Sequence, residues 1–168
     1  MCRDDYDNTI YCFVEFDPSG GTVVPEIKRL QQGQQIGQLP TAEREGHTLL
    51  GWIDSSTGNS IDAKTVVAAD IICLAQWLAQ TKFVFAGGST KYADIVGVFS
   101  KNTYMAYDTT GSGCRSVSLG DNVTSLAKGA FEATPIQSVY LTDKITSIPA
   151  RAFEGCNSLE HVQLGDAV

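Results

Sequence analysis

Three segments near the C-terminus repeat one pattern, and this repetition restricts the fold more than any other feature of the chain. They begin at Cys114, Ile136 and Leu159 and read CRSVSLGDNV, IQSVYLTDKI and LEHVQLGDAV, so the steps are 22 and 23 residues. A fixed period in this range is typical of a solenoid, in which each repeat stacks only on its neighbours. We therefore expect short parallel strands separated by compact turns or short helices.

Apolar residues recur in four columns of these segments. Because strand side chains alternate between two sides, Val139 and Leu141 are expected to point into a continuous core and Tyr140 outward. Leu164, the equivalent of Leu141, is expected to point inward as well. The columns are Cys114, Ile136 and Leu159; Val117, Val139 and Val162; Leu119, Leu141 and Leu164; and Val123, Ile145 and Val168.

The last full unit, residues 145–164, reads ITSIPARAFEGCNSLEHVQL. It resembles the BspA-like (Treponema-type) leucine-rich repeat almost letter for letter. The preceding unit departs from that pattern, with Thr134 at the position of Cys156 and Ala127 at the position of Pro149. In this family the cysteine is a core residue, so the resemblance implies no catalytic role for Cys156. It also implies that a ligand binds to the concave face formed by the strands.

The outward positions of the repeat strands are therefore our candidate binding residues. Stacked strands place them in a ladder, in which Tyr140 and His161 form a candidate contact pair. The alternative is a sheet face that is merely solvated. The candidates are Arg115, Ser116, Ser118, Gln137, Ser138, Tyr140, Glu160, His161 and Gln163.

The chain before residue 80 follows a different pattern, with alternating apolar residues separated by glycine-containing turns. A helical turn is expected at residues 41–45, ended by Gly46. Trp52 and Trp77 are expected to hold the small core of this part together. The expected extended segments cover residues 11–16, 22–30, 47–53 and 70–78.

Within residues 13–77, glycines and large apolar residues stand at a characteristic spacing. These marks are Phe16, Gly20–Gly21, Gly33, Leu39–Pro40, Gly46, Gly51–Trp52, Asp70, Ala75 and Trp77. With them the segment resembles a Listeria–Bacteroides repeat, the internalin-type B repeat, although His47 stands where the family usually has tyrosine. The resemblance implies a small β-grasp-like module of bacterial surface proteins, a spacer or contact unit without catalytic residues.

We thus expect a mainly β protein with three parts. Residues 1–80 form the β-grasp-like module with an N-terminal extension, residues 81–113 form a linker and the N-terminal cap of the solenoid, and residues 114–168 form the leucine-rich repeats. The boundary between the two halves is placed at residues 80–82. Aromatic residues that could cover the first repeat are Phe83, Phe85, Phe99, Tyr104 and Tyr107.

Composition excludes two classes of partner. The net charge of −7 and the lack of a basic patch argue against nucleic-acid binding. No apolar run is long enough for a membrane span. The acidic N-terminus does not resemble a signal peptide, so the chain is expected to be part of a longer exported protein or to leave the cell by another route.

The residues that could carry chemistry are sparse. The five cysteines include no CxxC pair, which argues against zinc and thioredoxin-like sites. Free buried thiols are favoured, and a Cys2–Cys12 bridge is the alternative. The acidic segment at residues 3–8 is interpreted as solvated rather than as a calcium site. The two histidines, His47 and His161, lie in different modules, and no catalytic motif occurs. We expect no enzyme activity, no cofactor and no metal.

These observations favour a non-enzymatic adhesion or protein-binding protein, extracellular or on the cell surface, with a protein or glycan as its ligand. The alternative is a structural assembly subunit, such as a virion head-fibre or capsid decoration protein. In that case a homo-oligomer or another partner chain would cover the edge of the last repeat strand.

Overall fold

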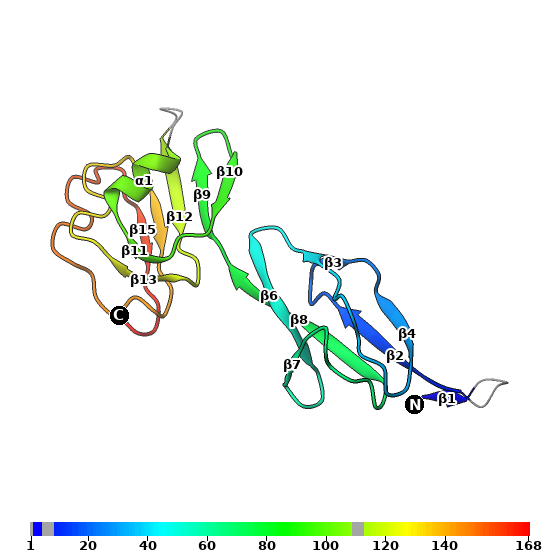
Figure 1. Cartoon of the computed structure of the whole chain (residues 1–168). Coiled ribbons are helices and arrows are strands. Elements are labelled where there is room, and N and C mark those ends of the chain that lie inside the picture. Colours follow the sequence, from blue (N-terminus) through cyan, green and yellow to red (C-terminus); the bar gives the residue numbers. More distant parts are fainter. Residues whose placement is uncertain (1, 5–8, 109–112) are drawn as a thin grey trace. The chain divides into compact units, whose positions relative to one another are not determined.

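The computed structural model describes residues 2–4, 9–108 and 113–168, and the protein is mainly β, as expected (Figure 1). The chain divides into two compact units, Met1–Trp77 and Leu78–Val168, and each has its own hydrophobic core. Among the described residues only α1 (Lys101–Tyr107) is an α-helix. Classification of the first unit as β-grasp-like and of the second as a solenoid stays a prediction.

The main sheet of the first unit is built around β2 (Ile10–Asp17). This strand pairs in parallel with β8 (Ile71–Ala79) and antiparallel with β4 (Ile27–Gln31) on its opposite edge. β1 (Arg3–Asp4) is also antiparallel to β2, and the sheet continues from β8 to β6 (His47–Asp54) and β7 (Ser60–Ile61). Alternate side chains of β2 are buried, so one side of this sheet faces the core.

The predicted helical turn at residues 41–45 is wrong. Ala42 and Glu43 form β5 (Ala42–Glu43), which pairs antiparallel with β3 (Thr22–Val23) in a separate two-stranded sheet. Ala42 and its partner Val23 are both buried in the core of this unit. The strand pairing buries both side chains and bonds their backbone, which outweighs the weak helical preference of the local sequence.

Trp52 lies at the centre of the first core, as expected. It is 3% exposed and packs edge-to-face on Phe16, with ring centroids 5.1 Å apart. Its indole N–H donates to the carbonyl of Pro40 at 3.1 Å, so the only polar atom of the buried side chain is satisfied.

Trp77 does not lie at the centre of the core. The expectation that both tryptophans hold this core together is therefore wrong for Trp77. Its side chain is only partly buried and packs against the periphery of the core. The indole N–H donates to the carbonyl of Pro18 at 2.8 Å, and the ring lies over Gly21, where an added Cβ would come within 2.9 Å of it. Trp77 therefore fixes the turn before β3 rather than filling the core.

In the second unit, five strands form the main sheet in the order β10, β9, β12, β14, β15. β12 (Cys114–Ser118), β14 (Ser138–Tyr140) and β15 (His161–Gln163) are the three repeat strands, and they are parallel. β9 (Thr81–Phe85) and β10 (Thr90–Ala93) extend the sheet antiparallel beyond β12. A second, two-stranded parallel sheet contains β11 (Gly97–Phe99) and β13 (Val123–Leu126).

The turns of successive repeats also bond to each other. The amide of Phe131 donates to the carbonyl of Ala152 at 2.8 Å, and that of Ala133 donates to Glu154 at 2.8 Å. Phe131 stacks on Phe153, its equivalent in the next repeat, with centroids 5.4 Å apart and planes 6° apart. The repeats that contain Phe131 and Phe153 are thus joined on the strand side and on the turn side.

Residues 81–113, assigned from sequence to a linker and cap, form β9, β10, β11 and α1 in their described part. Phe83, Phe85, Phe99 and Tyr104 are buried in the same core as the repeat residues, and Tyr107 stacks on Phe83 at 4.8 Å. The role of these residues as a cap of the first repeat stays a prediction.

The last repeat is less buried than the one before it. The expectation that Leu164 points into the core is therefore wrong. Leu141 is 7% exposed, whereas its equivalent Leu164 is 47% exposed; Ile145 is fully buried, whereas Val168 is 42% exposed. The physical reason is that, in the described part of the chain, β15 pairs with β14 and with no strand beyond it. The expectation that a partner covers this edge stays a prediction.

This difference gives a matched pair of substitutions. Leu141→Ala is expected to lower the free energy of unfolding of the second unit by about 2–5 kcal/mol, because it empties a buried site. Leu164→Ala removes the same atoms from a half-exposed site and is expected to cost about 1 kcal/mol or less. Denaturant unfolding followed by circular dichroism measures both, and equal losses would contradict the observed difference in burial between Leu141 and Leu164.

Candidate functional site

The outward side chains of the three repeat strands lie in two rows across the sheet. Val117 and Val139 alternate with them and are fully buried, so the rows lie on the side opposite the core. The sequence placed these residues on one face, and the observed register brings them side by side. One row contains Ser116, Ser138 and His161, and the other contains Ser118, Tyr140 and Gln163.

The candidate pair Tyr140 and His161 is in contact. The two rings have centroids 5.5 Å apart and planes inclined by 50°. Tyr140 is 37% exposed, and His161 is exposed as well. The pair offers an aromatic surface with two polar ring groups, of the kind enriched at protein interfaces.

The remaining three candidates, Arg115, Gln137 and Glu160, lie next to each other at the starts of the strands. The amide of Gln137 donates to the carbonyl of Arg115 at 2.7 Å, and the carbonyl of Gln137 accepts from the amide of Glu160 at 2.9 Å. Arg115 is the extra residue of a bulge between β12 and β9. Arg115 and Gln137 are half-buried and Glu160 is exposed.

Sequence reasoning missed the continuation of both rows onto β9 and β10. Val84 and Thr90 extend the row of Ser116, while Lys82 and Tyr92 extend the row of Ser118. The Lys82 ammonium lies 5.9 Å from the centre of the Tyr92 ring. The alternation in KFVF and the glycines after it are typical of a hairpin, although the sequence analysis assigned this segment only to the linker and cap. Nothing in the sequence indicates which strand the hairpin pairs with.

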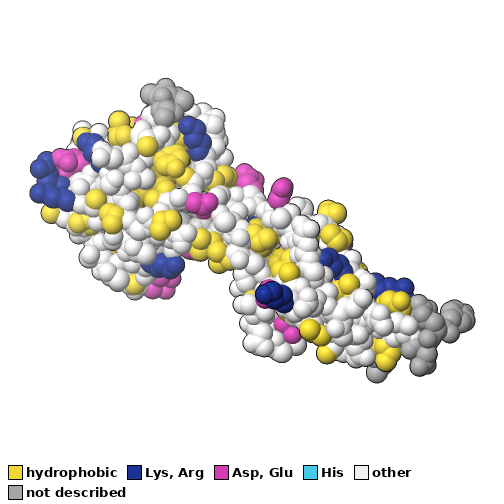
Figure 2. Space-filling model, viewed as in Figure 1, with side chains coloured by type: hydrophobic (Ala, Val, Ile, Leu, Met, Phe, Trp, Pro, Cys, Tyr) yellow, Lys and Arg dark blue, Asp and Glu magenta, His cyan; other side chains and the backbone are white. Residues whose placement is uncertain are grey.

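We call the outward side of this five-stranded sheet the outer face. Its ten strand positions are Thr90, Tyr92, Lys82, Val84, Ser116, Ser118, Ser138, Tyr140, His161 and Gln163. The strands that carry it are labelled in Figure 1. On the side of the molecule shown in Figure 2, hydrophobic side chains are scattered among polar and charged ones over both units.

In the described residues no hydrogen bond joins either histidine to a serine, threonine or cysteine side chain. His47 Nδ1 lies 2.8 Å from the carbonyl oxygen of Glu45, and its ring meets Trp77 at a centroid distance of 6.5 Å. A surface pocket of about 630 Å³ beside His47 is lined by Gly20, Gly21, Thr22, Ala42, Glu43, Arg44, Glu45 and His47.

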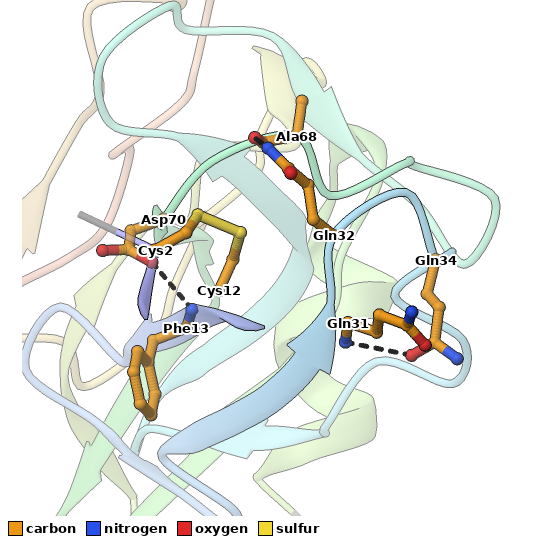
Figure 3. The surroundings of a disulfide bond; sticks show 8 residues. All are labelled: Cys2, Cys12, Phe13, Gln31, Gln32, Gln34, Ala68 and Asp70. Atoms are coloured by element: carbon orange, nitrogen blue, oxygen red, sulfur yellow. Dashed lines mark hydrogen bonds between the residues drawn. A yellow bond between two sulfur atoms is a disulfide. The ribbon is translucent and has the colours of Figure 1, made fainter. Parts of the chain in front are cut away.

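Cys2 and Cys12 form a disulfide, so the preference for free thiols was wrong for these two (Figure 3). The Asp70 carboxylate and both sulfurs lie within 4.8 Å of one another. Disulfide sulfurs are not thiolates, so this group is not a metal site while the bond is intact. Asp70 Oδ1 instead accepts from the amide of Phe13 at 2.9 Å. Asp5, Asp7 and Asn8 of the acidic segment lie outside the described residues.

The other three cysteines are free. Burial, together with the nearby charge of Asp54, raises the pKa of Cys73 to about 11, and burial raises the pKa of Cys114 to about 11. Both therefore stay protonated and unreactive at neutral pH. Cys156 is half-buried against the second core and donates to the carbonyl of Phe131 at 2.8 Å, consistent with a packing role.

Across the described residues, no helix has the length and apolar character that crossing a membrane requires.

Comparison with known protein families gives one match in each half of the chain. Residues 13–76 match the Listeria-Bacteroides repeat domain, and residues 99–168 match the BspA type leucine-rich repeat region. Both resemblances and their order are thereby confirmed, and the second match begins at Phe99 rather than at Cys114. Searches of curated proteins and of solved structures gave no significant match.

Proposed function

We propose that this chain, in which a Listeria-Bacteroides repeat domain precedes a BspA type leucine-rich repeat region, is a non-enzymatic surface protein that binds another protein through its outer face. Both kinds of repeat are typical of surface proteins, and leucine-rich repeats suggest protein binding. The proposal places the protein on or outside the cell, with the first unit as a spacer or contact module.

The observation that carries the proposal is the alignment of polar and aromatic side chains, exposed or half-buried, in two rows. The strand register fixes them beside one another on a sheet whose other side is a packed core. A rigid sheet lowers the entropy cost of binding, because the contact residues are already ordered. Tyr140 and His161 supply the aromatic surface on which binding energy tends to concentrate.

Two observations agree with a surface location. The Cys2–Cys12 disulfide is of the kind that persists in oxidising compartments. The free thiols of Cys73 and Cys114 are buried and protonated, which protects them from oxidation there. No observation favours the alternative of a virion subunit.

The proposal is tested by selecting a displayed library of random peptides against the immobilised full chain. A selected peptide is expected to lose about tenfold in affinity with Tyr140→Ala, because the truncation removes the exposed ring beside His161. Gln163→Ala, in the same row, is expected to weaken binding in the same direction. Fluorescence anisotropy with the labelled peptide measures the affinities.

Matched controls show whether a loss of affinity is specific to substitutions on the outer face. Met105→Ala removes a large exposed side chain of α1 in the same unit, and Gln76→Ala removes an exposed glutamine of the first unit. Neither should change the affinity. Binding that is unaffected by Tyr140→Ala and Gln163→Ala would show that the outer face is the wrong surface. Binding to glycans but to no peptide would replace the protein ligand by a glycan.

A further inference from the structure

We infer that the outer face, including the β9–β10 hairpin, recognises an extended acidic segment of a partner protein. This inference rests on the proposed function and names the chemistry of the ligand. It assigns specificity to Lys82 and Tyr92, which lie outside the residues that match the leucine-rich repeat family.

The first argument is the charge of the face. Of its ten strand positions, Lys82 carries the only permanent charge, and none is a carboxylate. The chain as a whole has 19 acidic and 12 basic residues, so strand positions without a carboxylate differ from the average surface. The one carboxylate among the candidate binding residues, that of Glu160, lies just before β15. Such a face attracts a carboxylate-bearing ligand and repels a cationic one.

The second argument is that this positive charge is not neutralised within the protein. No carboxylate of a described residue lies within ion-pair distance of the Lys82 ammonium. The interaction that this ammonium makes is with the Tyr92 ring. Arg115, at the start of β12, likewise has no ion pair with a described residue. Both cations can therefore pair with a ligand without breaking an existing salt bridge.

The third argument is that hydrogen-bond donors on the face are available to a ligand. The hydroxyls of Ser116, Ser118 and Ser138 make no side-chain hydrogen bond to another described residue. With the Tyr140 hydroxyl and the Gln163 amide they offer donors in both rows, and those of Ser118, Tyr140 and Gln163 lie in the row of Lys82. Carboxylates are acceptor-only groups and can accept from all of these donors. Because hydroxyls and amides also accept hydrogen bonds, it is the charge of Lys82 that favours a carboxylate over an amide.

The dimensions suit an extended peptide. Strands in a sheet are about 4.8 Å apart, so five strands span about 20 Å, the length of about six extended residues. A segment lying across the strands would meet Lys82 and Tyr140 about 10 Å apart, with the small Ser118 between them. The serines of β12 leave room there for the side chains of the ligand.

Three labelled peptides of about 12 residues, about twice the length of the face, test the inference with the full chain. They alternate threonine with glutamate, with glutamine or with lysine, so only the charge differs. The glutamate peptide is expected to bind most tightly in fluorescence anisotropy and to weaken as salt is added. Lys82→Gln should reduce the affinity for the glutamate peptide about two- to fivefold, as expected for loss of an exposed ion pair. The affinity for the glutamine peptide should stay unchanged.

Lys128→Gln is the matched control, because Lys128 is an exposed lysine of the same unit in the turn after β13. Equal losses from Lys82→Gln and Lys128→Gln would overturn the inference, since they would indicate a non-specific charge effect. Failure of the glutamate peptide to bind, or a lysine peptide that binds as tightly, would also overturn it. So would binding to a hyaluronan oligosaccharide in the absence of peptide binding.

The failure of this inference can be told from the failure of the proposed function. If a peptide from the random library loses affinity with Tyr140→Ala but not with Lys82→Gln, the outer face binds protein and the assignment of acidic ligands is wrong. If neither substitution affects the selected peptide, both proposals fail.

Discussion

Phe131→Ala is expected to lower the free energy of unfolding of the second unit by about 3–5 kcal/mol. Phe131 is fully buried and joins two parts of the core. It stacks on Phe99 at 5.1 Å and on Phe153 at 5.4 Å, and it meets Tyr104 edge-on at 6.1 Å. Alanine would leave a cavity and separate the aromatic cluster around α1 from the last repeat. A domain of this size is stable by roughly 5–15 kcal/mol, so the loss is a large fraction.

Unfolding of the first unit can be followed separately by tryptophan fluorescence. Both tryptophans, Trp52 and Trp77, lie in the first unit. Phe131→Ala should therefore shift the unfolding transition seen by circular dichroism to lower denaturant and leave the tryptophan fluorescence transition in place. Phe153→Ala is the control, because Phe153 is only partly buried and stacks on one ring. A loss from Phe153→Ala as large as that from Phe131→Ala would contradict the central role of Phe131.

Trp52→Ala is expected to cost about 3–5 kcal/mol in the first unit. The substitution removes the largest side chain of a small core and the edge contact to Phe16, and it leaves the Pro40 carbonyl without its donor. A domain of fewer than 80 residues has a small core, so its free energy of unfolding is small. We therefore expect the first unit to be largely unfolded at room temperature, with Trp77 fluorescence shifted to that of a solvated indole.

Trp77→Ala is the matched comparison in the same unit. Because Trp77 is partly buried and contacts the turn before β3, its removal should cost less than that of Trp52. Unfolding followed by circular dichroism measures both variants. Equal losses would mean that Trp77 belongs to the centre of the core, as the sequence alone suggested.

The repeat is the part that could be predicted best. Column residues of the first two segments, such as Val117 and Val139, are fully buried, and the strands that carry them are parallel and in register. This worked because a repeated side-chain pattern forces equivalent residues into equivalent environments. The pattern failed for Leu164, because burial in a stack also depends on a following neighbour, which the periodicity of one segment cannot supply.

The candidate face was predicted only in part. Alternation placed Ser138, Tyr140 and the other repeat positions on one side of the sheet. Lys82 and Tyr92 could not be assigned to it, because the pairing of β9 with β12 joins segments about 30 residues apart in the chain. Such pairings are decided by the fit of many side chains at once and not by the local sequence. The same reason explains why Ala42 and Glu43 form a strand where a helical turn was expected.

The sequence by itself determined the mainly β character, the period of the repeats and the side of each repeat strand that is buried, because all three follow from the spacing of apolar residues along the chain. The tertiary structure decided how far the sheet extends beyond the repeats, which tryptophan fills the first core, and which cysteines pair. Those features depend on contacts between residues far apart in the chain, and their free energy is gained only when the whole unit has folded.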